Sequence, residues 1–287
     1  RARRHEEAAG FYREALARGG EPEQLGPVLV QSLLALDQVD AARALMAEYH
    51  AKHPTSVPLL TAYSEVLVKQ KDRPEAREIL TQVLARQPYL VPQGMALAEI
   101  LWGNDEHEAA AGYLQRIVQV DAKHFASRAL LAEYHLRRSE PALALTRLDG
   151  ALALAPAEPG VRQQLRTLSL AAHGQAIRAA LSEGDAARAL HHLDRTVEIS
   201  PEDPQAHAAR AQVLAQLGDY GRAADALERL AELQPNNPTV LLSLGDLRQR
   251  QGRLDLATRH WAAARDLVAS DDEPLRAALD QRLGPSN

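Results

Sequence analysis

The sequence predicts an all-α protein, a solenoid in which antiparallel helix pairs repeat every 34 residues. Composition is the first observation behind this prediction: 46% of the 287 residues are hydrophobic and only 4% are aromatic. Ala, Leu, Glu, Arg and Gln, all good helix formers, are abundant. The second observation is an internal recurrence of alanine, followed at fixed distances by a large side chain and a proline.

Alanine marks one position in every predicted repeat. The eight alanines are Ala8, Ala42, Ala76, Ala110, Ala144, Ala189, Ala223 and Ala257. Four residues after them stand Tyr12, Met46, Leu80, Leu114, Leu148, Leu193, Leu227 and Trp261. An alanine lets two helices approach closely, and the large residue one turn later fills the space beside it.

The ends of the predicted helices carry breaking residues. Twelve residues after the alanine, five of the eight repeats have proline: Pro54, Pro88, Pro156, Pro201 and Pro235. Proline cannot continue a helix, so it is expected to end the second helix of each pair. Gly218-Asp219 and Gly252-Arg253 are expected to make the turns within pairs, and Gln234–Pro238 to form a loop between repeats.

These features resemble the tetratricopeptide repeat family. Its 34-residue pattern runs W-x2-L-G-x2-Y, then A-x3-F, then P. The residues in phase with it are Leu241, Leu244, Gly245, Ala257 and Trp261. The resemblance covers nearly the whole chain, and it implies a right-handed solenoid of antiparallel helix pairs that serves as a binding scaffold.

The regular spacing breaks once. Ala144 and Ala189 are 45 residues apart, which is one repeat plus 11 residues. Eleven residues are about three helical turns, so the insertion preserves helix phase. One apolar stripe runs through Val161, Leu165, Leu168, Ala172, Ala176 and Ala180. We therefore expect one long first helix at about 160–182; two helices separated at Gly174 are the alternative.

This break defines the expected domain organisation. Residues 1–158 form a first sub-array that opens inside the second helix of a truncated repeat, at about 6–18. Residues 159–182 form the long helix, which joins the sub-arrays. Residues 183–287 form a second sub-array that ends in a capping helix, in the segment DEPLRAALDQRL.

No motif for catalysis, a cofactor or a metal is present. The chain has no cysteine, which excludes disulfides, thiolate catalysis and Cys-ligated zinc. It also lacks a phosphate-binding Gly-rich loop and a G-x-S-x-G nucleophile motif. His107-Glu108 begins like a metalloprotease zinc motif, but Ala111 stands where the second histidine is needed. We expect no catalytic residues, no cofactor and no metal site, and therefore no enzyme.

Charge and hydropathy narrow the expected partners. The net charge is -5, whereas nucleic-acid binders usually carry a basic face. No stretch approaches 18 uninterrupted apolar residues, so no membrane span is expected. Only four of the 33 basic residues are lysine, which is typical of GC-rich, bacterial coding sequences. The chain begins at Arg1 and shows no signal peptide, so we expect a fragment or a processed form of a protein. The sequence leaves open whether the protein is cytoplasmic or periplasmic, and it does not specify the oligomeric state.

The family resemblance also implies where a partner binds. First helices line the inner face of such solenoids, through positions two, five, nine and twelve of the repeat. Position nine holds Glu65, Glu99 and Glu133, a ladder of carboxylates at intervals of 34 residues. The complete expected groove set is Thr61, Glu65, Val68, Met95, Glu99, Trp102, Glu133 and Leu136.

This groove favours a peptide or protein segment with apolar anchors and basic character. Three aligned carboxylates repel one another unless a cation relieves them, and tryptophan is a common interface hot spot. Alternatively, the glutamates only keep the surface soluble and Trp102 packs on the next repeat. The family's clamp for acidic tails uses Lys and Asn at such positions, and its sugar transferases use an Asn ladder; neither is expected here.

Three hypotheses about function follow. The chain is an interaction scaffold, an accessory region of a larger cell-envelope assembly or export machine, or the repeat region of an enzyme whose catalytic domain lies outside this chain. The complete reading frame distinguishes them.

Overall fold

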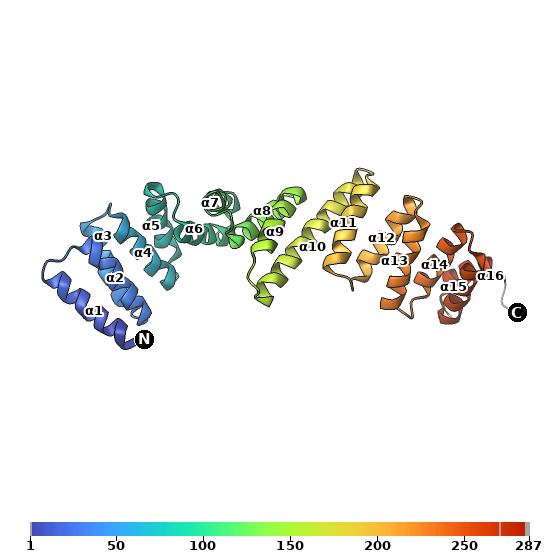
Figure 1. Ribbon diagram of the computed structural model, residues 1–287, viewed down its shortest axis with the longest axis horizontal. Coiled ribbons are helices and arrows are strands. Elements are labelled where there is room, and N and C mark those ends of the chain that lie inside the picture. The colour runs from blue at the N-terminus through green and yellow to red at the C-terminus, as the bar shows by residue number, and fades with distance from the viewer. Residues whose placement is uncertain (1, 270, 285–287) are drawn as a thin grey trace. The chain divides into compact units, whose positions relative to one another are not determined.

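The computed structural model describes residues 2–269 and 271–284, which form sixteen α-helices and no strand (Figure 1). The helices are α1 (Ala2–Ala17), α2 (Pro22–Ala35), α3 (Val39–Lys52), α4 (Val57–Gln70), α5 (Arg73–Arg86), α6 (Val91–Gly103), α7 (His107–Val120), α8 (Phe125–Arg137), α9 (Pro141–Leu154), α10 (Pro159–Ser182), α11 (Ala186–Ile199), α12 (Pro204–Gln216), α13 (Tyr220–Leu233), α14 (Pro238–Arg250), α15 (Leu254–Leu267) and α16 (Glu273–Leu283). The predicted all-α repeat fold is confirmed. Positions 1, 270 and 285–287 of the predicted sub-arrays lie outside the described residues.

The chain forms two compact units. Unit 1 comprises residues 1–137 and 146–158, and unit 2 comprises residues 138–145 and 159–287. Within each unit, helices pack mainly on their neighbours in the chain, as in the pairs α4/α5, α6/α7, α12/α13 and α14/α15. In unit 1, α2 also contacts α4, and α4 contacts α6, so first helices of successive pairs lie side by side. The sub-array boundary at residue 158 and the joining role of the long helix stay predictions.

The recurring alanines are buried in the helix packing. Seven of the eight have no exposed surface: Ala42, Ala76, Ala110, Ala144, Ala189, Ala223 and Ala257. The large residues one turn later are also buried from Met46 to Trp261, with at most 8% exposure. Removing this apolar surface from water supplies the main stabilisation of each pair.

The helix ends follow the predicted breakers. Each of the five prolines stands two residues beyond a second helix; Pro54, for example, follows the end of α3 at Lys52. Gly218 and Gly252 adopt φ of 79° and 75°, a left-handed conformation that glycine reaches without strain. Asp219 then caps α13, because its carboxylate accepts a hydrogen bond from the backbone amide of Arg222.

The long first helix is continuous. α10 spans 24 residues, and Gly174 lies in its interior without a turn. The stripe through Leu165, Ala172, Ala176 and Ala180 is buried. At the chain's start, α1 already begins at Ala2, earlier than the expected boundary. Among the described helices, none has the combination of length and hydropathy that a bilayer span requires.

The contact between α14 and α15 generates a stability prediction. A Cβ atom at Gly245 would lie 2.4 Å from Cδ1 and Nε1 of the buried Trp261 ring. Because a packed indole cannot move aside freely, Gly245→Ala is expected to lower the free energy of unfolding by about 1–3 kcal/mol. Urea denaturation followed by Trp fluorescence and far-UV circular dichroism measures the change.

Gly174→Ala is the matched control in the same unit. The nearest atom to its added Cβ would be the Arg178 guanidinium, 3.7 Å away, which is ordinary contact. Alanine should therefore stabilise α10 by about 0.5–1 kcal/mol, the usual helix-propensity gain. Equal effects of the two substitutions would contradict the proposed clash at Gly245.

Candidate functional site

The predicted groove residues divide into three local groups in unit 1. Thr61 and Glu65 line a pocket of about 260 Å³ that α2 also borders. Val68 and Glu99 line a second pocket of about 260 Å³, between α4, α5 and α6. Trp102 and Glu133 form the third group, because both contact Arg137. The structure thus brings residues of adjacent repeats together in the second and third groups, whereas Thr61 and Glu65 both lie on α4.

Two predicted groove residues serve packing more than a surface. Leu136 is buried, with 8% exposure. Met95 is half-buried and packs against the core, and its sulfur accepts a hydrogen bond from the Ser127 hydroxyl at 3.1 Å. Neither side chain is placed as a free contact residue for a partner.

Trp102 is held between two helices. Its ring lies 4.5 Å from the His107 ring of α7, measured between centroids. The Arg137 guanidinium of α8 stands 5.5 Å from the indole centroid, in cation–π geometry. Arg137 also donates to Glu133 Oε1 at 3.1 Å. Trp102 therefore does contact the next repeat, and its side chain is half-buried.

The three ladder carboxylates are not equivalent. Glu133 is neutralised by Arg137, its neighbour one turn along the helix. Glu65 and Glu99 are exposed and form no ion pair within the described residues. Partial dehydration by surrounding atoms raises the pKa of Glu65 above its ordinary value. A cation bound beside Glu65 would offset this dehydration.

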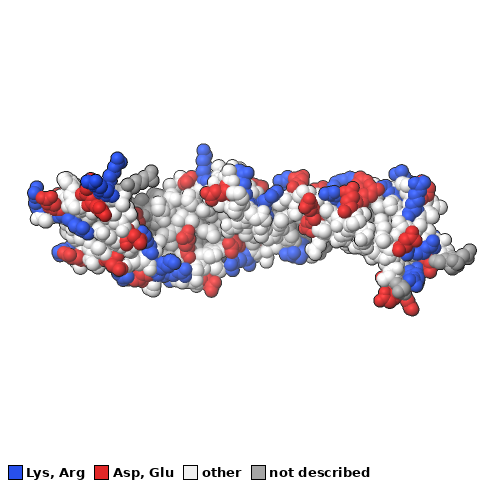
Figure 2. Space-filling view, turned by 90° about the horizontal axis from the view of Figure 1, so that it is seen from below, with Lys and Arg blue, Asp and Glu red and all other residues white. Residues whose placement is uncertain are grey.

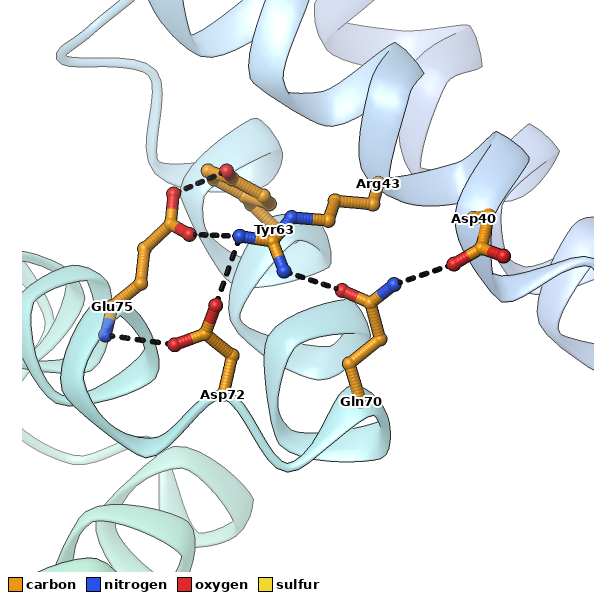
Figure 3. Close-up of polar contacts among 6 residues, drawn as sticks. All are labelled: Asp40, Arg43, Tyr63, Gln70, Asp72 and Glu75. Atoms are coloured by element: carbon orange, nitrogen blue, oxygen red, sulfur yellow. Dashed lines mark hydrogen bonds and ion pairs between the residues drawn. The ribbon is translucent and has the colours of Figure 1, made fainter.

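A polar network beside this surface connects successive pairs (Figure 3). Arg43 of α3 donates through Nη2 to Asp72 at 2.9 Å and to Glu75 at 2.6 Å, and through Nη1 to Gln70 at 3.0 Å. The Tyr63 hydroxyl donates to the other Glu75 oxygen. Burial and this hydrogen bond raise the pKa of Tyr63 to about 12. The network holds α3 against α4 and α5, and it leaves no group positioned to act as a base.

The same arginine clasp recurs one repeat later. Arg77 stands 34 residues after Arg43 and forms a two-pronged ion pair with Glu106, at 2.6 and 2.9 Å. These arginines therefore bridge from a second helix to the turn of the following pair. The 34-residue spacing of the arginines was a readable signal that the sequence analysis missed.

A larger groove lies in unit 2, between α12, α13 and α14, with a volume of about 750 Å³. Its buried floor is apolar: Ala211, Leu227, Leu230, Val240 and Leu247. Its polar lining is Gln205, Gln212, Gln216, Gln234, Asn237, Thr239, Ser243, Asp246 and Arg250. An apolar floor with a polar rim is the usual anatomy of a binding surface.

The repeat register locates this groove. Counted from Ala223, the second, fifth, ninth and twelfth positions of α12 are Gln205, Ala208, Gln212 and Ala215, and all four line it. The same count, which places Glu65, Glu99 and Glu133 in the middle repeats, therefore also identifies these residues of α12 from the sequence.

The two charged residues of the unit 2 groove differ in their surroundings. Asp246 accepts hydrogen bonds from Arg282 Nε at 2.6 Å, Arg282 Nη2 at 2.7 Å and Trp261 Nε1 at 3.0 Å. Its charge is thereby balanced. Arg250 instead stands over the Tyr220 ring, 5.5 Å from the centroid, and pairs with no carboxylate within the described residues. The groove can therefore both donate and accept hydrogen bonds.

A histidine pair lies in the packing of α10 on α11. His173 is buried, and its Nδ1 lies 3.2 Å from Nδ1 of His192, so one ring donates and the other accepts. Burial, followed by the proximity of His192, lowers the pKa of His173 to about 4. Within the described ranges, no cluster of three or more His, Cys, Asp or Glu is arranged to hold a metal ion.

In a comparison with known proteins, residues 33–89 and 180–244 match the family described as Tetratricopeptide repeat. No curated protein matches the chain. The chain is similar to a solved tetratricopeptide repeat (TPR) protein from Parabacteroides merdae ATCC 43184, at 14% identity and a TM-score of 0.42, covering 97% of this chain and 98% of that one.

Two further solved structures are similar. YrrB, described as a TPR protein with an unusual peptide-binding site, shares 16% identity, with a TM-score of 0.41 and coverage of 72% of this chain and 100% of YrrB. A thermophilic TPR protein of Thermus thermophilus shares 24% identity, with a TM-score of 0.32 and coverage of 67% of this chain and 98% of that one. Likenesses of this degree carry no inference about function.

The histidine pair predicts an acid-sensitive stability. The pKa of His173 in the folded chain lies below the ordinary value of 6.5, so folding favours the neutral ring. Its contribution is complete above pH 6.5 and is lost as the pH falls towards 4. Between pH 7.5 and 4.5 this group should remove on the order of 2 kcal/mol from the free energy of unfolding.

Urea denaturation at both pH values checks this in the wild type and in His173→Asn, whose side chain has no comparable titration. The substituted chain should lose less stability on acidification than the wild type. His5→Asn, in α1 of unit 1, is the control and should leave the pH dependence nearly unchanged. An identical acid loss in wild type and His173→Asn would refute the assignment.

Proposed function

The chain carries tetratricopeptide repeats, and we propose that it is a non-catalytic interaction scaffold that holds a peptide or protein segment in grooves lined by its first helices. The observation that supports this most directly is the groove of about 750 Å³ between α12, α13 and α14. This volume lies in the usual range of ligand-binding pockets, about 300–1,000 Å³, and is large enough to take several side chains of a peptide. Its buried leucines offer an apolar contact, and its rim offers amides and hydroxyls.

The lining of α12 makes this groove accessible to a main chain. Ala208 and Ala215 are small and stand between the longer side chains of Gln205, Gln212 and Gln216. A partner's backbone can therefore approach the helix closely at the alanines. The glutamines on either side can reach its peptide groups.

A second surface, the carboxylate ladder of unit 1, supports a different partner. Glu65 and Glu99 lack a counter-cation within the described residues, and the half-buried Trp102 keeps part of its ring accessible. We propose that this surface binds a segment with basic and apolar side chains. Each of these two carboxylates offers a charge partner to a basic side chain, as electrostatic complementarity requires.

The surface charge supports a protein partner over a nucleic acid. Figure 2 shows acidic and basic side chains interspersed over each unit on the face drawn, without a broad basic area. A nucleic-acid interface would need clustered Lys and Arg to neutralise phosphates. The arginine-rich composition supports a bacterial source for the protein.

A blocked groove tests the main proposal. Ala208 is exposed in the groove lining, so Ala208→Arg should fill the groove without disturbing the core. Panning a phage-displayed random heptapeptide library on the full chain should enrich sequences that bind the wild type and not Ala208→Arg. Circular dichroism confirms that the variant is folded. If no enriched peptide is lost on Ala208→Arg, the groove is not a peptide site.

The ladder is tested separately by charge removal. The triple substitution Glu65→Gln, Glu99→Gln and Glu133→Gln should abolish capture of synthetic Lys- and Leu-containing peptides that the wild type binds at low salt. Trp102→Ala should weaken the same binding by about 2 kcal/mol or more. The matched control replaces three exposed glutamates of second helices, Glu6, Glu48 and Glu78, and should retain binding. Capture that survives the ladder substitutions at low and moderate salt would mean that the ladder is only a solvated surface.

A further inference from the structure

We propose that the groove between α12 and α14 selects an extended partner segment of about five residues that carries no basic side chain and places a carboxylate against Arg250. The inference rests on the proposed function, because it names the class of ligand for that groove. Three features of the groove lining support it. They are a row of glutamine side chains without hydrogen bonds, the Asp246 carboxylate, which is already paired with Arg282, and the Arg250 guanidinium, which has no carboxylate partner within the described residues.

The row of amides lies along the exposed side of α12. Within the described residues, the side chains of Gln205, Gln212 and Gln216 make no hydrogen bond. Each primary amide carries donors and an acceptor, which match the N–H and C=O of a peptide group. Eleven residues at 1.5 Å per residue place the first and last of these amides about 16 Å apart along the helix. An extended chain covers that distance in about five residues, at roughly 3.3 Å each.

The charges at the rim decide which side chains are tolerated. Asp246 is engaged by both donors of Arg282 and by the indole of Trp261, so it offers little to an incoming cation. Arg250 is exposed, and its guanidinium faces the Tyr220 ring instead of a carboxylate. The other lining residues are uncharged. The groove therefore presents a net positive charge, which repels Lys and Arg and stabilises a carboxylate.

Arg250 also fixes where the carboxylate lies. It is the last residue of α14, as Gln216 is the last residue of α12, and both line the groove. The carboxylate is therefore expected at the end of the segment that reaches these helix C-termini. It comes from an Asp or Glu side chain or from a C-terminal residue of the partner.

This selectivity is opposite to that of the ladder in unit 1. There, Glu65 and Glu99 are the charges without an ion pair within the described residues. The two units thus offer separate surfaces of opposite preference. A partner segment suited to one is disfavoured by the other.

The probes are the heptapeptides enriched on the wild type and lost on Ala208→Arg, each synthesised with fluorescein in three forms that end in Glu, Gln or Lys. Fluorescence anisotropy with the full chain should show the Glu form binding at least fivefold more tightly than the Lys form. Arg250→Gln should reduce that preference to less than twofold. Gln212→Ala should weaken all three forms by about threefold or more, because it removes a main-chain contact. Arg259→Gln, an exposed arginine of α15 outside the groove, is the matched control and should change neither quantity.

The outcomes separate this inference from the proposed function. Groove-dependent peptides that prefer Lys, or a Glu preference that persists in Arg250→Gln, overturn the inference and leave the groove as a peptide site. Absence of any peptide that distinguishes the wild type from Ala208→Arg overturns both. A separate series that compares amidated and free C-termini decides whether the carboxylate belongs to a side chain or to a chain end.

Discussion

The close approach of paired helices at fully buried alanines is the constraint on which the other features depend. At Ala257, as at the six equivalent alanines without exposed surface, any larger side chain would separate the helices. Gly245 of α14 must also stay small, because a Cβ atom there would lie 2.4 Å from the Trp261 ring of α15. Because this contact sets the distance between the two helices, the large residue one turn later packs in the space beside the alanine. Each helix pair therefore adopts the same geometry.

That packing leaves one face of each first helix free, and this face is where the two units differ. In unit 1 it carries Glu65 and Glu99 beside Trp102; in unit 2 it carries amides over an apolar floor. The scaffold tolerates both because these positions contribute little to the core. A shared backbone arrangement can therefore present surfaces of different chemistry.

The turns within the helix pairs show that the repeat tolerates non-glycine residues at a position with positive φ. The turns before α11, α13 and α15 have Gly184, Gly218 and Gly252 at their left-handed position, with φ of 74°, 79° and 75°. In the equivalent turns earlier in the chain, Asp37, Lys71, Asp105 and Ser139 adopt φ between 58° and 61°. Each non-glycine residue there costs roughly 1 kcal/mol, which the packing of the flanking helices offsets.

The sequence by itself determined the helices, the prolines that end them, the in-phase insertion that lengthens α10, and the ladder positions, because all follow from local periodicity. Only the tertiary structure decided that Arg137 pairs with Glu133 and stands over Trp102, that His173 meets His192, and that the groove along α12 has a volume of about 750 Å³. Periodicity states which face a residue occupies, whereas pairing depends on side-chain reach across helices. The His173–His192 contact spans 19 residues and two helices, a distance over which no sequence spacing specifies a partner.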